Sequence, residues 1–132
     1  MTLLPGVYKF DGAATMNGML TLDAAVDPKA VWMFQIGTSF LATEGSSVIF
    51  KDSIGNPDMV YWQVGSSATL AVGVSMVGNI LALASITVNN GATVNGRCLA
   101  RNGAVTLDNS VITKPAVVAF SATQTVSGIS LE

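Results

Sequence analysis

The sequence predicts an all-β fold, a parallel β-helix (solenoid) of triangular cross-section. Three consecutive segments, 60–78, 79–96 and 97–114, follow one pattern. Thr69, Thr87 and Thr106 occupy the same place in each segment, at spacings of 18 and 19 residues. A fixed period of about twenty residues is typical of a solenoid in which each repeat is one turn. Each segment holds three short apolar stretches separated by Gly, Asn or Ser, which predicts three strands and three corners per turn.

The same unit continues toward the N-terminus. Residues 34–37 (FQIG) match residues 62–65 (WQVG), and residues 38–47 follow the pattern of residues 66–75. The segment 50–59 is polar and contains Gly and Pro, so we expect a loop inserted between two turns. An earlier, more weakly marked turn begins with an expected strand at 7–10. Residues 3–115 should therefore form about five turns.

Alternation along the strands predicts which side chains point inward. Before the second corner the inward residues should be Ala68, Leu70, Ile86, Val88, Val105 and Leu107. After that corner they should be Val74, Met76, Ala92 and Val94. The outward positions between them carry Thr and Ser, so stacked turns should form ladders of small hydroxyl side chains.

The remaining strand of each turn is apolar at nearly every position, which is typical of strands covered on both sides. We expect Trp62, Leu81 and Leu99 to point inward there. The outward column would then consist of Met33, Tyr61, Ile80 and Cys98. A column of this kind is too apolar to face water alone. It should be covered by a second chain through self-association, by residues 116–132, or by a helix.

Composition excludes several classes of function. Half of the residues are apolar, 11% are charged and the formal net charge is −2, so no basic patch is available for nucleic acid or anionic lipid. No apolar run is long enough for a membrane helix. The chain contains no histidine, which removes most catalytic triads and the commonest metal ligand. We therefore expect no enzyme, no metal and no cofactor. Cys98 is the single cysteine, so no disulfide can form within the chain.

The remaining charged residues have ordinary interpretations. Asp23 and Asp27 flank a segment that ends in Pro28, where a turn is a better explanation than a pair of catalytic carboxylates. Arg97 and Arg101 could pair with Asp108 or line a sugar site, although a solvated or corner position is favoured.

Several segments together resemble the C-terminal part of the microbial ice-binding (antifreeze) protein family of the DUF3494 type. They include LPGVYKF (4–10), WQVGSSATL (62–70), GATVNGR (91–97) and LARNGAVTL (99–107), and the matches cover nearly all of residues 3–115. The resemblance implies a right-handed parallel β-helix with a long helix along one side, ice binding, inhibition of recrystallisation, secretion and no cofactor.

The resemblance also sets the expected domain organisation. Residues 1–115 would form a partial ice-binding domain that lacks the family's N-terminal coils and long helix. Residues 116–132 match no family segment and would be a C-terminal extension, an edge strand or a cap. The family often carries a T-G-x-T-like corner, whereas the equivalents here are EGSS (44–47), VGVS (72–75) and NGAT (90–93).

Ice offers neither a charge pattern nor a pocket-sized ligand, so a binder needs a flat, rigid and regularly spaced surface. Threonine is stiff at χ1 and combines a hydroxyl with a small apolar body. One candidate surface is centred on Thr69, Thr87 and Thr106, and the other carries Ser47, Ser75 and Thr93 just after the corners. We favour the first, with Ser75 and Thr93 on its edge. The predicted ice-binding residues are Thr43, Ser67, Thr69, Ser75, Ser85, Thr87, Thr93 and Thr106.

Two alternatives stay open from the sequence. Threonine is also a good strand residue on a solvated face with no ligand at all. The same solenoid could be a structural or adhesive module that binds a polysaccharide or a partner protein. A carbohydrate site needs exposed aromatic side chains, whereas the aromatic residues here lie in apolar runs, which favours burial. Those residues are Tyr8, Trp32, Tyr61 and Trp62.

Overall fold

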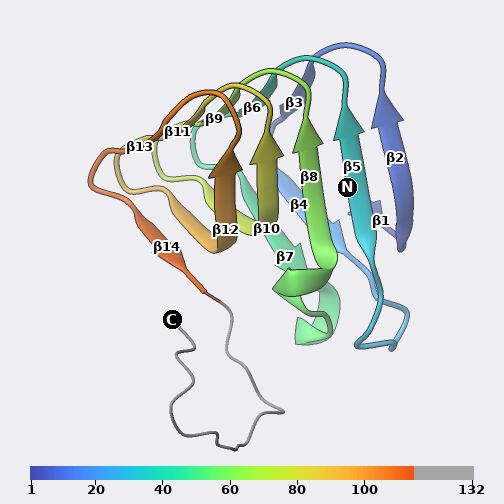
Figure 1. Cartoon of the computed structure of the whole chain (residues 1–132). Helices are drawn as coiled ribbons and strands as arrows, with labels where there is room; N and C mark the ends of the chain where they lie inside the picture. Colours follow the sequence, from blue (N-terminus) through green and yellow to red (C-terminus); the bar gives the residue numbers. More distant parts are fainter. Residues whose placement is uncertain (115–132) are drawn as a thin grey trace, which may run out of the picture.

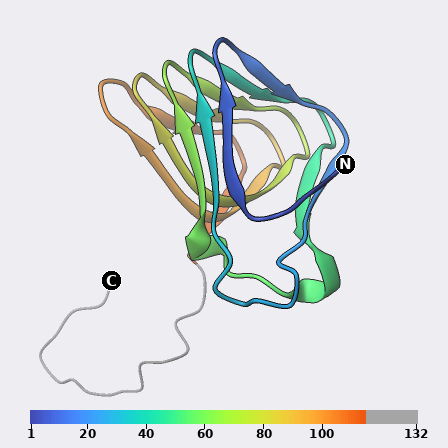
Figure 2. The same ribbon diagram turned by 90° about the vertical axis from the view of Figure 1, so that its right-hand side faces the viewer.

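The computed structural model describes residues 1–114, and the expected C-terminal extension, strand or cap at 116–132 lies outside the described residues. Every strand pairing among the described residues is parallel, and the chain winds repeatedly through three faces (Figure 1). Figure 2 shows the turns stacked one behind another with a three-sided outline. The predicted parallel β-helix is therefore confirmed.

The three faces run along the stack and follow one another in the chain. Face 1 consists of β2 (Gly6–Phe10), β5 (Trp32–Ile36), β8 (Val60–Val64) and the second halves of β10 (Ser75–Ala82) and β12 (Thr93–Ala100). Face 2 consists of β3 (Ala14–Met16), β6 (Phe40–Ala42), β9 (Ala68–Leu70), β11 (Ile86–Val88) and β13 (Val105–Leu107). Face 3 consists of β1 (Thr2–Leu3), β4 (Met19–Leu22), β7 (Ser47–Phe50), the first halves of β10 and β12, and β14 (Val111–Thr113).

The core lies between the faces and is built from columns of inward side chains. On face 1 the ring of Phe34 stacks on Tyr8 and on Trp62, with centroid distances of 5.5 and 4.0 Å. Such pairs contribute about 0.5–1.5 kcal/mol beyond the burial of their area. Both tryptophans are fully buried, as expected, whereas both tyrosines are partly exposed.

The predicted alternation is confirmed on faces 2 and 3. All inward residues of the two central turns are buried, namely Ala68, Leu70, Val74, Met76, Ile86, Val88, Ala92 and Val94. In the last described turn Val105 is half-buried and Leu107 is 49% exposed. These two side chains are more accessible because no further turn covers them within the described residues.

The prediction for the third strand of each turn is wrong in two of the turns. Ile80 pairs in register with Trp62 and with Cys98, so all three point inward. Ile80 is fully buried, whereas Leu99 is 55% exposed. The prediction placed Ile80 beside Tyr61, an offset of 19 residues, whereas the two strands pair at an offset of 18, with Ile80 beside Trp62. The offset differs because a loop precedes β8, whereas β10 and β12 run from face 3 to face 1 as continuous strands.

The outward column on face 1 is consequently less apolar than expected. Met33 and Tyr61 are its outward members in two turns, and Asn79 and Arg97 continue it in the next two. The four-residue column Met33/Tyr61/Ile80/Cys98, which was expected to need a cover, therefore does not exist as a surface. The polar residues that continue it, Asn79 and Arg97, form hydrogen bonds with Asp58 in the loop that precedes β8.

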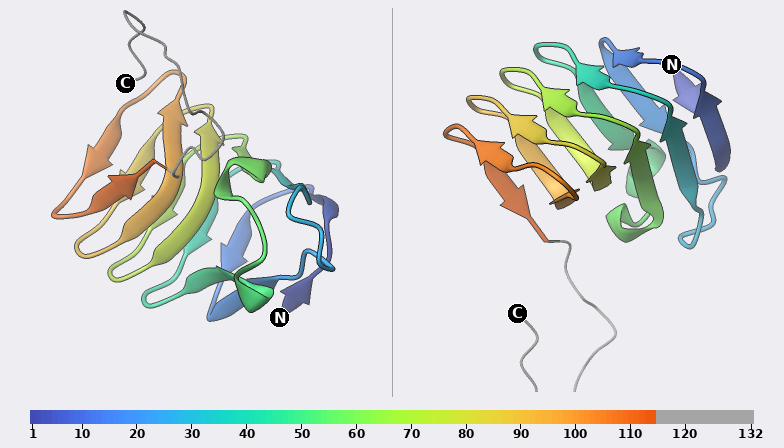
Figure 3. Two further views of the ribbon diagram at one scale, coloured as in Figure 1. Left: turned by 90° about the horizontal axis from the view of Figure 1, so that it is seen from below. Right: turned by 45° about the horizontal axis from the view of Figure 1, so that its top comes forward.

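The corners between faces 2 and 3 are tight turns built on glycine. The N–H groups of Ser46, Val74 and Ala92 donate to the carbonyl three residues earlier at 3.0, 3.3 and 3.0 Å. The third residue of each turn is a glycine with φ between 71° and 74°, which is the arrangement of a type II turn. Figure 3 shows the corners of successive turns lined up in rows.

The corner between faces 1 and 2 requires glycine for a different reason. A β-carbon on Gly65 would overlap the backbone carbonyl of Gly37 in the preceding turn, and one on Gly37 would overlap Asp11 in the same way. In these turns the backbones can therefore approach each other closely at this corner because the side chain is absent, whereas Leu83 and Arg101 occupy the equivalent position in the next two turns.

Among residues 1–114, inserts leave the stack only between faces 3 and 1. The predicted loop contains two 3₁₀ helices, η1 (Lys51–Ser53) and η2 (Pro57–Met59). The earlier insert is the predicted turn, since the amides of Ala25 and Lys29 donate to the carboxylates of Asp23 and Asp27 at 2.9 Å each. The bond from Ala25, aided by Lys51, lowers the pKa of Asp23. Among residues 1–114, no helix has the length and apolar character needed to cross a membrane.

Candidate functional site

The central outward column of face 2 is a ladder of threonines. Thr69 pairs with Thr87, and Thr87 pairs with Thr106, in exact strand register. The ladder continues through Leu41 to Thr15 in the first turn. The predicted alignment of the three threonines is therefore confirmed, and the spacing between successive side chains is that of parallel strands, about 4.7–4.9 Å.

The hydroxyls of this ladder are not used by the fold. Within residues 1–114 the side chains of Thr69, Thr87 and Thr106 make no hydrogen bond, whereas the backbones on both sides are paired. Thr69 and Thr87 are half-buried by their neighbours and Thr106 is exposed. A half-buried, β-branched side chain between two identical neighbours has few rotamers available, so its hydroxyl and methyl keep fixed positions.

Two further columns flank the threonines on face 2. On one side lie Ser67 and Ser85, both half-buried, and the amide of Ser85 donates to Ser67 Oγ at 3.4 Å. On the other side lie Ala71 and Asn89, and the Asn89 side chain donates to the carbonyl of Leu70 at 3.1 Å. The strands of face 2 and the residues on either side of them contain no Lys or Arg.

Thr43 is the predicted site residue that the structure uses internally. Its hydroxyl lies 2.9 Å from Asn17 Oδ1 and 3.0 Å from Ser46 Oγ. Ser46 is fully buried and accepts a hydrogen bond from the amide of Gly18 at 3.2 Å. The corner of the first turn is two residues shorter than the corner of the next turn, so the serine hydroxyl takes the place of a missing backbone partner. Thr43 therefore supports the corner.

The second candidate column lies on face 3. Ser47 pairs with Ser75, and Ser75 pairs with Thr93, in register at the start of their strands. Ser75 and Thr93 are exposed, and none of the three side chains makes a hydrogen bond within the described residues. Apolar residues bound this column at both ends, because Met19 precedes Ser47 in the stack and Val111 follows Thr93.

The eight predicted site residues thus lie on two faces. Five of them share face 2, Thr43 lies at its edge with its hydroxyl turned into the corner, and Ser75 and Thr93 lie on face 3. Thr15 was missed, because the first turn is weakly marked in the sequence. Its signal was the segment TMNG (15–18), which repeats TVNNG (87–91) with one residue fewer.

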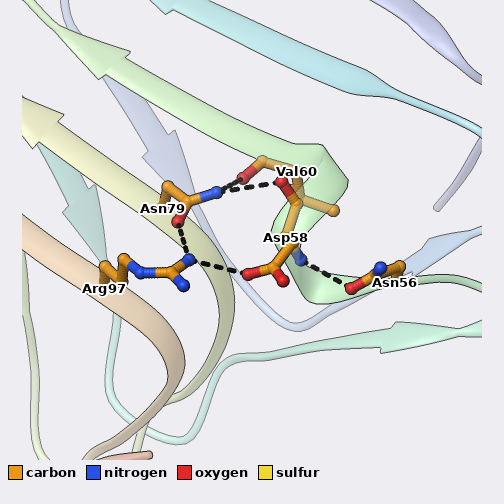
Figure 4. Close-up of polar contacts among 5 residues, drawn as sticks. All are labelled: Asn56, Asp58, Val60, Asn79 and Arg97. Carbon is orange, nitrogen blue, oxygen red and sulfur yellow. Dashed lines mark hydrogen bonds and ion pairs between the residues drawn. The ribbon is translucent and has the colours of Figure 1, made fainter. Parts of the chain in front are cut away.

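Arg97 has a structural partner that the sequence did not reveal. Its Nη1 lies 2.7 Å from Asp58 Oδ1 and 3.2 Å from Asn79 Oδ1 (Figure 4). Asn79 in turn donates to the carbonyls of Asp58 and Val60 at 3.2 and 3.1 Å. The suggested pairing of Arg97 with Asp108 is therefore wrong. These hydrogen bonds instead connect η2, in the loop before β8, to the outer side of face 1.

The remaining candidates for reactivity are the Cys98 thiol and the carboxylates that could bind a metal ion. Burial raises the pKa of the Cys98 thiol to about 11, which keeps it protonated and unreactive at neutral pH. Among the described residues, no three Asp, Glu, Cys or His side chains are grouped so that they could hold a metal ion. The shape and chemistry of faces 2 and 3 are those of an extended surface and not of a pocket.

Comparison with known families and proteins gives a consistent result. The family model described as "Ice-binding-like" matches residues 1–113. The chain is 46% identical over 121 residues to the ice-binding protein of Nostoc sp. (strain HG1), covering 87% of this chain and 44% of that protein. It is 32% identical over 115 residues to ice-binding protein 1 of Shewanella frigidimarina, covering 86% of this chain and 13% of the relative. The chain thus spans less than half the length of these curated relatives.

Solved structures show the same fold. An ice binding protein from an Antarctic biological consortium aligns with a TM-score of 0.82 and 39% identity, over 87% of this chain and 52% of that one. The ice-binding protein of the Antarctic ascomycete Antarctomyces psychrotrophicus aligns with a TM-score of 0.81 and 43% identity, over 85% of this chain and 54% of the other. The DUF3494 domain of the Shewanella protein aligns with a TM-score of 0.83.

Proposed function

Because the chain belongs to the ice-binding-like family, we propose that it binds ice crystals through face 2. The observation that carries the proposal is the in-register ladder of Thr69, Thr87 and Thr106, whose hydroxyls have no partner in the described part of the chain. Ser67 and Ser85 extend this surface on one side. Ser75 and Thr93 are its adjoining edge around the corner.

The geometry of face 2 suits a crystalline ligand. Side chains repeat about every 4.7–4.9 Å from turn to turn, and outward side chains on one strand are roughly 6.6 Å apart, so the surface is a two-dimensional grid. Each grid point of the ladder presents a hydroxyl beside a methyl group. Water molecules held on such a grid are ordered in two directions, which is what docking to an ice plane requires.

Rigidity supports the same conclusion. Docking to a solid loses affinity for every side chain that must be immobilised. Face 2 has short side chains, β-branched residues in its central column, and corners closed by a hydrogen bond at each of three turns. The absence of Lys and Arg keeps long, mobile cations off the surface.

The adhesive alternative has less support. Carbohydrate sites use exposed aromatic rings beside polar groups, and Trp32 and Trp62 are both buried in the core. The described chain also offers no basic surface for nucleic acid, since Arg97 is paired and face 2 has no cation. We therefore regard the protein as a binding protein and not an enzyme, and we place it outside the cell, where family members would meet ice.

The test is ice activity of the purified chain, measured as inhibition of recrystallisation and as thermal hysteresis. Thr87→Arg should abolish both, because a long charged side chain at the centre of face 2 lifts the surface off the lattice. Thr93→Arg places the same side chain on face 3, and Gln63→Arg places it on face 1 as a matched control. All three should fold normally, because Thr93 and Gln63 are exposed and the half-buried Thr87 points outward with no side-chain hydrogen bond within the described residues. Surface substitutions of this kind usually change stability by no more than about 0.5 kcal/mol.

The outcomes separate the surfaces. Loss of activity in Thr87→Arg with activity retained in Gln63→Arg supports face 2. Loss in Thr93→Arg alone would assign the site to face 3 and contradict our choice. Absence of activity in the unmodified chain would show that this part of the protein does not bind ice by itself.

A further inference from the structure

Four Asn-Gly pairs occur in this chain, at residues 17–18, 90–91, 95–96 and 102–103. Asparagine followed by glycine is the pair most prone to spontaneous deamidation, because glycine adds no side chain to hinder the reaction. The backbone nitrogen of the glycine attacks Cγ of the asparagine, ammonia leaves and a succinimide forms. Water then opens the ring to aspartate or isoaspartate, so the site gains a negative charge without any oxidant or cofactor.

The structure restrains two of these pairs by hydrogen bonds. Asn90 Oδ1 accepts from Asn109 Nδ2 at 2.8 Å, and the attacking nitrogen, that of Gly91, donates its hydrogen to the carbonyl of Asn109 at 3.1 Å. In the first turn, Asn17 Oδ1 lies 2.9 Å from the Thr43 hydroxyl. The nitrogen of Gly18 donates to Ser46 Oγ. In both pairs the asparagine side chain and the attacking nitrogen are each held by a hydrogen bond, which must break before the ring can close.

The third pair is restrained by the sheet. Asn95 lies inside β12 and is paired with β10 on one side and β14 on the other. Gly96 lies so close to Gly78 that even a β-carbon would overlap its carbonyl. Succinimide formation requires the peptide after the asparagine to rotate, and a strand paired on both sides resists that rotation.

The fourth pair lacks the hydrogen bonds and the two-sided strand pairing of the others, although a β-carbon on Gly103 would overlap Ser85 Oγ and the Ala84 carbonyl of the preceding turn. Asn102 and Gly103 lie in the corner between faces 1 and 2 of the last described turn, and both are exposed. Within the described residues the Asn102 side chain has no hydrogen bond and the Gly103 amide donates to no group, although the amide of Asn102 donates to the carbonyl of Leu83. Within the described residues the corner therefore leaves both reacting atoms without a hydrogen bond.

We propose that Asn102 is a site of spontaneous deamidation and that Asn109 protects Asn90 from the same reaction. The positions of Asn90 and Asn102 decide where deamidation would add a negative charge relative to the candidate site. Asn90 lies at the corner that joins Thr87 on face 2 to Thr93 on face 3, so a charge there would fall between the two hydroxyl columns. Asn102 lies at the opposite corner of face 2, in the same turn as Thr106.

The experiment is peptide mapping by mass spectrometry after incubation of the full chain in mildly alkaline buffer, below its unfolding temperature. Asn102 should convert about 25-fold faster than Asn90, the factor expected when two ordinary hydrogen bonds, each worth about fivefold, must be broken first. Asn102→Gln is the matched control, because glutamine forms the corresponding ring far more slowly. Faster conversion at Asn90, Asn17 or Asn95 than at Asn102 would overturn the proposal.

Asn109→Gly tests the protecting contact directly. Asn109 has φ of 45°, so glycine accepts its backbone conformation while removing the Nδ2 donor. Conversion of Asn90 should rise about fivefold, the effect of one hydrogen bond, and conversion of Asn102 should stay the same. An unchanged rate at Asn90 in a folded variant would refute the protecting role. If the variant does not fold, the ranking of the four sites in the unmodified chain still decides the proposal.

Discussion

Ile80→Ala is the substitution that tests the architecture most directly, because Ile80 was expected outside and lies inside. Its side chain is fully buried, with Trp62 in the preceding turn and Cys98 in the following one. Truncating a buried isoleucine to alanine costs about 2–5 kcal/mol, depending on how well the site can collapse. The neighbouring turns are held by in-register pairing and cannot move in, so we expect a cost well above the lower end of that range, about 3–4 kcal/mol.

Leu81→Ala is the matched control, since Leu81 is adjacent in β10 but lies in register with the exposed Gln63 on the outer side of face 1. It should cost about 1 kcal/mol or less. Urea unfolding measures both variants, and the slope should stay constant so that the midpoint reports stability. For a domain of this size Ile80→Ala should lower the melting temperature by roughly 10 °C. A larger loss in Leu81→Ala than in Ile80→Ala would refute the strand register described here.

Three further outcomes are expected. Leu41→Thr completes the threonine ladder of face 2, so recrystallisation should be inhibited at lower concentration; weaker inhibition would show that Leu41 itself contacts ice. Burial raises the pKa of the Cys98 thiol from 9.0 to about 11, so this thiol ionises at lower pH in the unfolded chain than in the folded one. The free energy of unfolding should therefore fall as the pH rises from about 9 to about 11, and Cys98→Ala should lack this contribution. Gly65→Ala should destabilise by about 1–3 kcal/mol through its overlap with Gly37, whereas Gly12→Ala, with open space around it, should not, as denaturant midpoints will show.

The sequence predicted the repeating elements well because the β-helix constrains every turn in the same way. The spacing of Thr69 and Thr87 implied the register of face 2, and the structure has that register. The inward alternation followed from it, because a strand has a period of two. The spacing of one pair of threonines was therefore sufficient to predict the inward residues of faces 2 and 3.

Face 1 was harder to predict because its strands are apolar on both sides, so alternation gives no direction. Only the period could decide between Ile80 and Leu81, and the insert before β8 obscured the period. The partners of Arg97 were beyond prediction for another reason: Asp58 is 39 residues away and lies in the insert, which has no counterpart in the other turns. Long-range contacts of a unique loop leave no repeating signal in the sequence.

The candidate site was predicted as a set of residue types, and the structure divides that set between face 2 and face 3. Corners closed at Gly73 and Gly91 turn the chain from face 2 to face 3, so a flat crystal that contacts Thr87 does not also lie flat on Thr93. The two hydroxyl columns are therefore alternatives, or they meet different crystal planes. Face 2 has the longer ladder, and within the described residues its central threonine hydroxyls make no hydrogen bond, because the inward side chains supply the stability. That separation of roles is why a charged residue at position 87 should remove binding and leave the fold intact.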